Sequence, residues 1–325
     1  MPTEFFPSAS TLVPALAVEI EERLVRLDQR GMERVRKEWR AGYLLEAVDA
    51  LLQERARVLI VSGFPIGETF ETDGPAGALV LASALRELGS EVALAGLPAY
   101  LAQLREGAAL LGLENNLLYQ SSSLESGADV SAPLHRAVEQ FRPTLLVFVE
   151  VPGSASDGNY YNMRRQNISA RTFDWEPLLS VCNCPSIAFA DGGNELGMGR
   201  VGSALRQLDI EPAVSVTDHL VISDVSNWGV YGAVALASAR VHRDLFPSLP
   251  LETLLQALNL SGIVDGVTGS TTPTEDGLPA ARGQSLIREL RQLAASAIAG
   301  SDFPEHSIPE HSSSTVAEGL AESIS

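Results

Sequence analysis

The segment SIAFADGGNELGMGRVG, residues 186–202, joins a short apolar run to a loop with five glycines and several polar side chains. The apolar run 186–190 is typical of a buried strand, and the glycines mark the loop that leaves its carboxyl end. Ligands of open α/β sheets usually bind at that end. Asp191, Asn194 and Glu195 therefore stand where a site is expected, with little side-chain bulk around them.

Apolar runs and helical patterns alternate on both sides of this segment. The runs that we expect to form further strands are 57–62, 91–95, 117–119, 144–149 and 219–223. Helical patterns fall at 75–88, 98–111, 132–140, 194–208, 228–241, 251–258 and 280–299. Such alternation is typical of βαβ units built around a parallel sheet. The sequence therefore predicts an α/β, Rossmann-like three-layer fold with a mostly parallel sheet flanked by helices.

Changes in composition divide the chain into three parts. Residues 1–55 carry a helical pattern interrupted at Gly31 and Gly42, and we expect them to form a helical segment that packs on the core. Residues 56–300 hold the alternating elements and form the predicted α/β domain. Residues 301–325 carry five acidic side chains, many serines and no lysine or arginine. We expect this acidic tail to be disordered.

The charge of the chain limits its partners. A net charge of −18 over 325 residues disfavours nucleic acid and anionic membranes as binding partners. Lys37 is the single lysine and lies in a charged helical stretch, so we expect neither a phosphate-binding loop nor a pyridoxal Schiff base. Residues 1–4 lack the positive charge of a signal peptide, and no apolar run reaches the roughly 18 residues of a membrane span. We expect a cytoplasmic protein with reduced thiols at Cys182 and Cys184.

A second polar loop follows the run 144–149. Residues 157–167, DGNYYNMRRQN, combine amides, tyrosines and two arginines. We expect this loop to open into a helix, which would direct free backbone amides and Asn159 at an anion. Arg164 or Arg165 would then bind a carboxylate in bidentate fashion. The alternative is a helix cap beside a solvated arginine pair.

Carboxylates gather in the loop before the helix that is expected to begin at Pro75. Glu68, Glu71 and Asp73 offer oxygen ligands that suit Mg²⁺ or Mn²⁺, or the ammonium group of a substrate. The alternative is an acidic solvent loop that caps the helix. Asp265, in a further Asp-Gly turn, is a candidate to complete an acidic cleft.

Two other patterns carry less chemistry. Residues 197–202 spell G-x-G-x-x-G, but the motif starts seven residues past the strand-like run instead of leaving it directly, so we expect no dinucleotide. Ser226 and Asn227 follow the run 219–223, where they are candidates for a site or for a helix cap. His219 is expected to be structural, and no G-x-S-x-G motif supports a serine hydrolase.

Five segments taken together resemble the D-glutamate cyclase family, in particular its C-terminal cyclase domain and the stand-alone bacterial relatives. The matching segments follow the family's order and are ETDGP (71–75), DGNYYN (157–162), DGGNELGMG (191–199), SNWG (226–229) and DGVTG (265–269). Val230 departs from the glycine expected after SNWG. Vertebrate members also carry an N-terminal half that resembles hydro-lyases, to which we expect no counterpart in this chain.

The resemblance implies a hydro-lyase that converts D-glutamate to 5-oxo-D-proline and water. Its substrate would be a small acidic amino acid, and its cofactor Mn²⁺ or Mg²⁺. Two alternatives stay open: a lyase or cyclase for a related amino or hydroxy acid, and a non-enzymatic module that binds an acidic metabolite with a divalent metal. The oligomeric state stays open too, with a homo-oligomer as one possibility.

The same resemblance gives roles to individual residues. The amine must lose a proton before it attacks the γ-carboxylate, and Asp191 or Glu195 is the candidate base. Asp73 and Asp157 are candidates to bind a metal or the substrate ammonium group. The candidates for substrate binding are Asn159, Tyr160, Asn162, Arg164, Arg165, Gly192, Gly193, Asn194 and Asn227.

Overall fold

The computed structural model describes residues 9–119 and 138–299. The predicted polar loop 121–129, most of the predicted helix 132–140, and the tail 301–325 lie outside these residues. In the part of the chain that is described, no helix combines the length and apolar character needed to cross a bilayer.

Six parallel strands form the central sheet in the order β5-β4-β1-β6-β7-β8. They are β1 (Arg57–Ser62), β4 (Glu91–Gly96), β5 (Leu117–Tyr119), β6 (Leu145–Val149), β7 (Ser186–Ala190) and β8 (His219–Ile222). The chain winds outward from β1 to β5, then starts again on the other side of β1 with β6. Sheets of this order bind ligands where the winding reverses. The predicted fold class is confirmed, and the predicted strands agree within one residue at each end.

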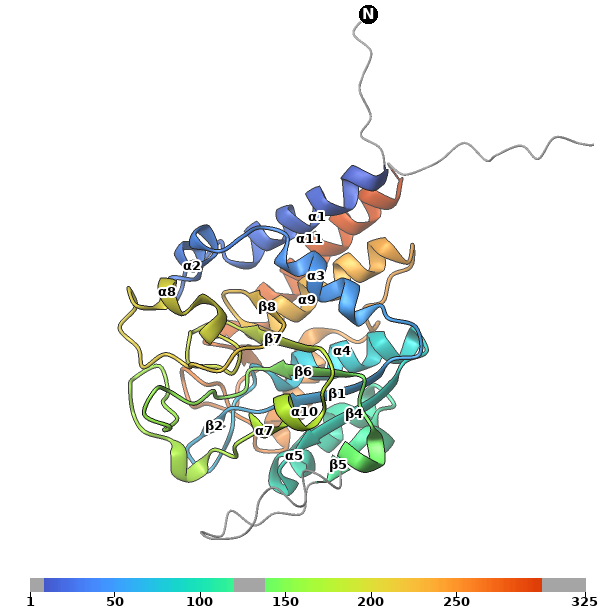
Figure 1. The fold of residues 1–325 in the computed structure, drawn as a ribbon. Coiled ribbons are helices and arrows are strands. Elements are labelled where there is room, and N and C mark those ends of the chain that lie inside the picture. The colour runs from blue at the N-terminus through green and yellow to red at the C-terminus, as the bar shows by residue number, and fades with distance from the viewer. Residues whose placement is uncertain (1–8, 120–137, 300–325) are drawn as a thin grey trace, which may run out of the picture.

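Helices cover the sheet because its strands are apolar along their whole length; β6 and β7 are buried at every residue. On one face α4 and α9 pack together, with α5 and α3 beside them, and α1, α10 and α11 pack outside this layer (Figure 1). A right-handed crossover places α7, which links β6 to β7, on the opposite face. The helices of this arrangement are α1 (Ala9–Leu24), α2 (Met32–Glu38), α3 (Tyr43–Leu51), α4 (Pro75–Glu87), α5 (Pro98–Leu110), α7 (Pro177–Val181), α9 (Ser226–Arg240), α10 (Leu251–Leu260) and α11 (Ala280–Ala299).

The N-terminal helices share the hydrophobic core of the α/β layers. Ile20 and Leu24 of α1 are buried against α9 at Gly232, where a Cβ atom would lie only 2.8 Å from a Leu24 methyl group. The turn after α1 is tied to the sheet, because the Leu27 backbone N–H donates to Asp224 Oδ2 at 2.7 Å. This tie directs the α1–α2 turn toward the carboxyl ends of the strands.

The helix predicted at 194–208 and the expectation that the loop 157–167 opens into a helix are both wrong. Residues 194–208 form a turn followed by a 3-10 turn at Gly199–Val201 and the short helix α8 (Gly202–Leu205). Gly193 and Gly197 have φ angles of +104° and +100°, which an α-helix cannot accommodate. Residues 157–167 form tight turns with isolated bridges in place of a helix.

Two short hairpins complete the architecture. The first, β2 (Pro65–Ile66) with β3 (Thr69–Phe70), lies within the predicted loop after β1. The second, β9 (Thr274–Glu275) with β10 (Leu278–Pro279), turns at Asp276 and Gly277, whose φ angles of +52° and +75° suit a two-residue hairpin turn.

Candidate active site

The carboxyl ends of β1, β6 and β7 face a cavity of about 250 Å³ at the reversal point of the sheet. The α1–α2 turn, the loops after these three strands, segment 157–167 and the β9–β10 hairpin all contribute to its lining. Because these segments are far apart in the sequence, the cavity exists only in the folded chain.

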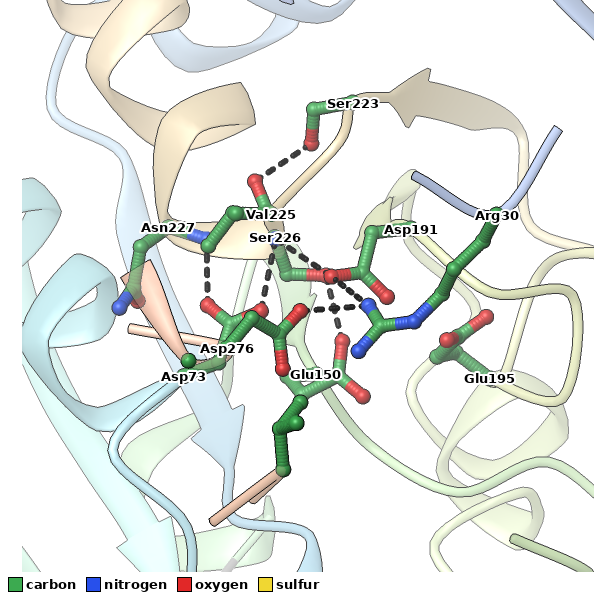
Figure 2. Close-up of polar contacts among 12 residues, drawn as sticks. Arg30, Asp73, Glu150, Asp191, Glu195, Ser223, Val225, Ser226, Asn227 and Asp276 are labelled. Carbon is green, nitrogen blue, oxygen red and sulfur yellow. Dashed lines mark hydrogen bonds and ion pairs between the residues drawn. The ribbon is translucent and has the colours of Figure 1, made fainter. Parts of the chain in front are cut away.

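Six buried carboxyl groups form a cluster here; all of them except Asp73 line the cavity, and all except Glu71 are labelled in Figure 2. They come from the loop after β1, the residue after β6, the loop after β7 and the β9–β10 hairpin. Each residue is at most 7% exposed: Glu71, Asp73, Glu150, Asp191, Glu195 and Asp276. Such a set of carboxyl groups needs protons or a cation, because unpaired buried charges are strongly unfavourable.

Arg30 supplies one positive charge to this cluster. Its Nη1 lies 2.6 Å from Asp191 Oδ2 and also contacts Asp276 Oδ2 (Figure 2). The side chain is 18% exposed, and Arg30 lines the cavity together with Asp191 and Asp276.

Burial raises the pKa of the clustered carboxyl groups. It raises the pKa of Asp73 to about 8, helped by the negative charge of Asp276. Burial also raises the pKa of Asp191 well above the ordinary range, although the positive charge of Arg30 opposes the increase. It likewise raises the pKa of Glu150, and the negative charge of Glu195 raises it further. With Arg30 as the cation, the cluster therefore retains protons near neutral pH, which suits acid–base chemistry.

Glu150 occupies the first position after β6 with a φ angle of +50°. This left-handed conformation is strained for a residue with a side chain, and such strain is concentrated at functional sites. The Ser226 hydroxyl donates to Glu150 Oε2, which fixes the carboxyl group beside the start of α9.

Asp73 and Asn227 cap each other's helices. Asp73 Oδ2 and Oδ1 accept the backbone N–H groups of Ser226 and Asn227 at 2.8 and 2.7 Å, at the start of α9. Asn227 Oδ1 accepts those of Gly74 and Gly77 at 2.9 and 2.6 Å, at the start of α4. The Asn227 amide is thus occupied within the protein, and Asn227 does not line the cavity.

The loop after β7 supplies three of the predicted residues together. Asp191, Asn194 and Glu195 all line the cavity. Glu195 Oε2 accepts the Gly193 backbone N–H at 2.7 Å, which orients this carboxyl group within a turn that only glycine-rich sequence forms.

Segment 157–167 reaches the cavity with only part of its predicted set. Asn162 and Arg164 line it, and the Arg164 guanidinium has no partner among the described residues. Arg165 points elsewhere, because it pairs with Asp209 and Glu211 on the surface.

The other predicted residues of this segment lie outside the cavity lining. Asp157 is exposed, and hydrogen bonds from the Tyr161 hydroxyl and the Asn159 amide hold its pKa at about 2. Tyr160 is buried beside Asp174. These side chains fold the turn, since Asn162 Oδ1 likewise accepts two backbone N–H groups.

The cluster contains two groups of carboxylates suited to a divalent cation. In each, three oxygens lie within 4.8 Å of one another: Asp73, Asp191 and Asp276 in one, and Glu150, Asp191 and Glu195 in the other. Hard oxygen donors of this kind fit Mg²⁺ or Mn²⁺. Asp191 belongs to both groups, Asp73 to one, and Asp157 to neither.

Comparison of the sequence with known proteins identifies a family for this chain. The family model described as D-glutamate cyclase-like, C-terminal, matches residues 22–291. The chain belongs to this D-glutamate cyclase-like family. It is 36% identical over 217 residues to the human protein named D-glutamate cyclase, mitochondrial. That match covers 60% of this chain and 34% of the human protein, so the chain spans about a third of that relative's length.

Three residues of this D-glutamate cyclase-like site escaped the sequence prediction. Glu150 directly follows the apolar run that became β6, so the rule that identified Asp191 would also have found it. Asp276 stands before Gly277, and an Asp-Gly pair is ordinary turn chemistry that does not mark a site residue. Arg30 gave no local signal, because its importance comes from contacts with residues more than 150 positions later in the chain.

Proposed function

We propose that the chain is a hydro-lyase that closes D-glutamate to 5-oxo-D-proline and water. The observation that supports this most is a cavity lined by buried carboxyl groups, by Arg30 and by Arg164, whose guanidinium has no partner among the described residues. A dicarboxylic amino acid needs both features: cations for its carboxylates and acid–base groups for its amine. Family membership supports the same reaction.

Arg164 is the proposed anchor for a substrate carboxylate. Its planar guanidinium can bind a carboxylate through two parallel hydrogen bonds, and no described residue competes for it. Arg30 is suited to the other carboxylate, because charge that develops on the attacked carboxyl group would be stabilised by the guanidinium.

The reaction moves two protons from nitrogen to oxygen. The ammonium group loses both, a C–N bond forms at the carbon of the γ-carboxylate, a C–O bond breaks at that same carbon, and the oxygen leaves as water. Glu195 and Asp191 are the proposed bases for the amine. A neighbouring carboxyl group with a raised pKa, such as Glu150, can protonate the departing oxygen.

A divalent cation would be held by one of the two carboxylate groups that share Asp191. When bound, Mn²⁺ or Mg²⁺ would polarise the γ-carboxyl group as a Lewis acid. Arg30 already contacts Asp191 and Asp276. A bound cation near these oxygens would therefore interact with the same carboxylates as the Arg30 guanidinium.

Incubation of the purified protein with D-glutamate tests the proposal, with 5-oxoproline measured by chromatography with and without Mn²⁺. We expect product from the D-enantiomer, and none from the Asp191→Asn variant despite an unchanged circular dichroism spectrum. Glu68→Gln is the matched control, because Glu68 is an exposed carboxylate outside the cavity. Thermal stabilisation by D-glutamate without product under any condition would instead favour the metabolite-binding module.

A further inference from the structure

We infer that Asn194 accepts a hydrogen bond from the substrate's amine and makes the cavity selective for amino acids over plain dicarboxylates. This inference deepens the proposed cyclase function and rests on it for the identity of the substrate. Asn194 is 2% exposed and lines the cavity together with the candidate bases Asp191 and Glu195.

The Asn194 amide has a fixed direction and an unused acceptor. Its Nδ2 donates to the Tyr161 carbonyl at 2.8 Å, which determines which end of the amide is the oxygen. Its Oδ1 is buried and has no hydrogen-bond partner among the described residues. An unsatisfied buried acceptor is unfavourable, and a ligand that donates to it would remove the deficit.

Gly192 allows this acceptor and Glu195 to pack closely against the backbone. A Cβ atom at position 192 would lie 2.9 Å from Asn194 Oδ1 and 2.7 Å from Glu195 Oε1. The amide oxygen and an oxygen of the candidate base therefore lie close together beside Gly192. A substrate amine that reaches this part of the cavity lining would meet a neutral acceptor and a carboxylate together.

A neutral acceptor suits a nucleophilic amine. A carboxylate stabilises the ammonium form and so opposes the deprotonation that attack requires. An amide oxygen orients an N–H bond without adding negative charge, which leaves proton removal to Glu195. Asn194 thus positions the nitrogen, and the neighbouring carboxylate takes its proton.

The test compares D-glutamate with glutarate, which has the same two carboxylates and lacks the amine. For Asn194→Ala we expect kcat/KM for D-glutamate to fall by about tenfold, the effect of one lost hydrogen bond of about 1.4 kcal/mol. The inhibition constant of glutarate should change by less than about twofold. Retained glutarate binding also shows that the variant is folded.

Asn259→Ala is the matched control. Asn259 is also buried, donates its Nδ2 to a backbone carbonyl and leaves its Oδ1 without a partner among the described residues, but it lies on α10 outside the cavity. We expect this variant to lower the melting temperature without changing the ratio of D-glutamate to glutarate affinity.

The outcomes separate the inference from the proposed function. If wild type forms 5-oxoproline and Asn194→Ala weakens D-glutamate and glutarate equally, the amine contact is wrong and the function stands. If wild type binds D-glutamate without turnover, selective loss of that binding in Asn194→Ala supports the contact while the cyclase function fails. A wild type that is stabilised equally by both compounds overturns the contact.

Discussion

Arg30, in the turn between α1 and α2, places a positive charge beside the clustered carboxyl groups. Arg30→Gln should lower kcat/KM for D-glutamate at least about 100-fold, since it removes the cation beside Asp191 and the donors for the attacked carboxylate. The free energy of unfolding should fall by only about 1–3 kcal/mol, because the carboxyl groups can take up protons once the arginine is gone.

Arg26→Gln is the control for this variant. Arg26 lies on the same turn but pairs at the surface with Glu289. Steady-state kinetics and urea denaturation of both variants make the comparison. Equal activity of Arg30→Gln and Arg26→Gln would show that Arg30 has a structural role alone.

Asp224 gives the stability of the α1–α2 turn a pH dependence. Burial raises its pKa from 3.8 to about 6, although it accepts the Leu27 N–H. Because the folded protein favours the protonated form, its stabilising contribution is present below about pH 4 and is lost as the pH rises through about 6. Asp224→Asn keeps an oxygen for Leu27 and cannot ionise.

We therefore expect Asp224→Asn to be more stable than wild type at pH 7 by about 1–3 kcal/mol, and equally stable near pH 3.5. Melting curves across this range measure the difference. A constant gap between the two proteins at all pH values would contradict the raised pKa of Asp224.

At the scale of elements, α4 and α9 begin at a shared pair of caps. Asn227→Ala removes the acceptor for the N–H groups of Gly74 and Gly77 at the start of α4 and the donor to buried Glu275. We expect a loss of at least about 2 kcal/mol in urea denaturation, since a cap and a buried hydrogen bond disappear together. Asn167→Ala, which removes an exposed turn contact, should cost less than about 1 kcal/mol. Equal losses would refute the cap at Asn227.

Strands and helices with a regular pattern of apolar residues could be predicted from the sequence, whereas the segments of irregular turns could not. The run 57–62 and the Pro75 helix start were both confirmed, because apolar continuity and proline at the first turn have local causes. The loop 157–167 does not open into a helix as expected, and the helix expected at 194–208 does not form, each for a local reason. Asparagine and aspartate side chains fold the first segment into turns, and positive-φ glycines prevent a helix in the second.

The whole molecule determines what the site contains. The position of Asp191 and Glu195 at the cavity could be predicted from the sequence, because one rule about strand ends applies to both. Asp157 matches the family's motif as well as Asp73 does, yet only Asp73 reaches the carboxyl cluster. No local pattern distinguishes the two, because the difference is made by the packing of α4 against α9 and by the turn at 157–167.

Divalent cation binding should therefore act on the stability of the whole domain. The two carboxylate groups join the loops after β1, β6 and β7 to the β9–β10 hairpin, and none of these sets exists in the unfolded chain. Mn²⁺ at about 100 times its dissociation constant should add about 2.7 kcal/mol to the free energy of unfolding, and a chelator should reverse the gain.

Asp191→Asn should abolish this gain in stability, since Asp191 belongs to both carboxylate groups, whereas Glu68→Gln should retain it. Glu150→Gln and Asp276→Asn then discriminate between the groups, because each removes an oxygen from one group alone. Stabilisation by Mn²⁺ that persists unchanged in Asp191→Asn would place the cation outside this cluster.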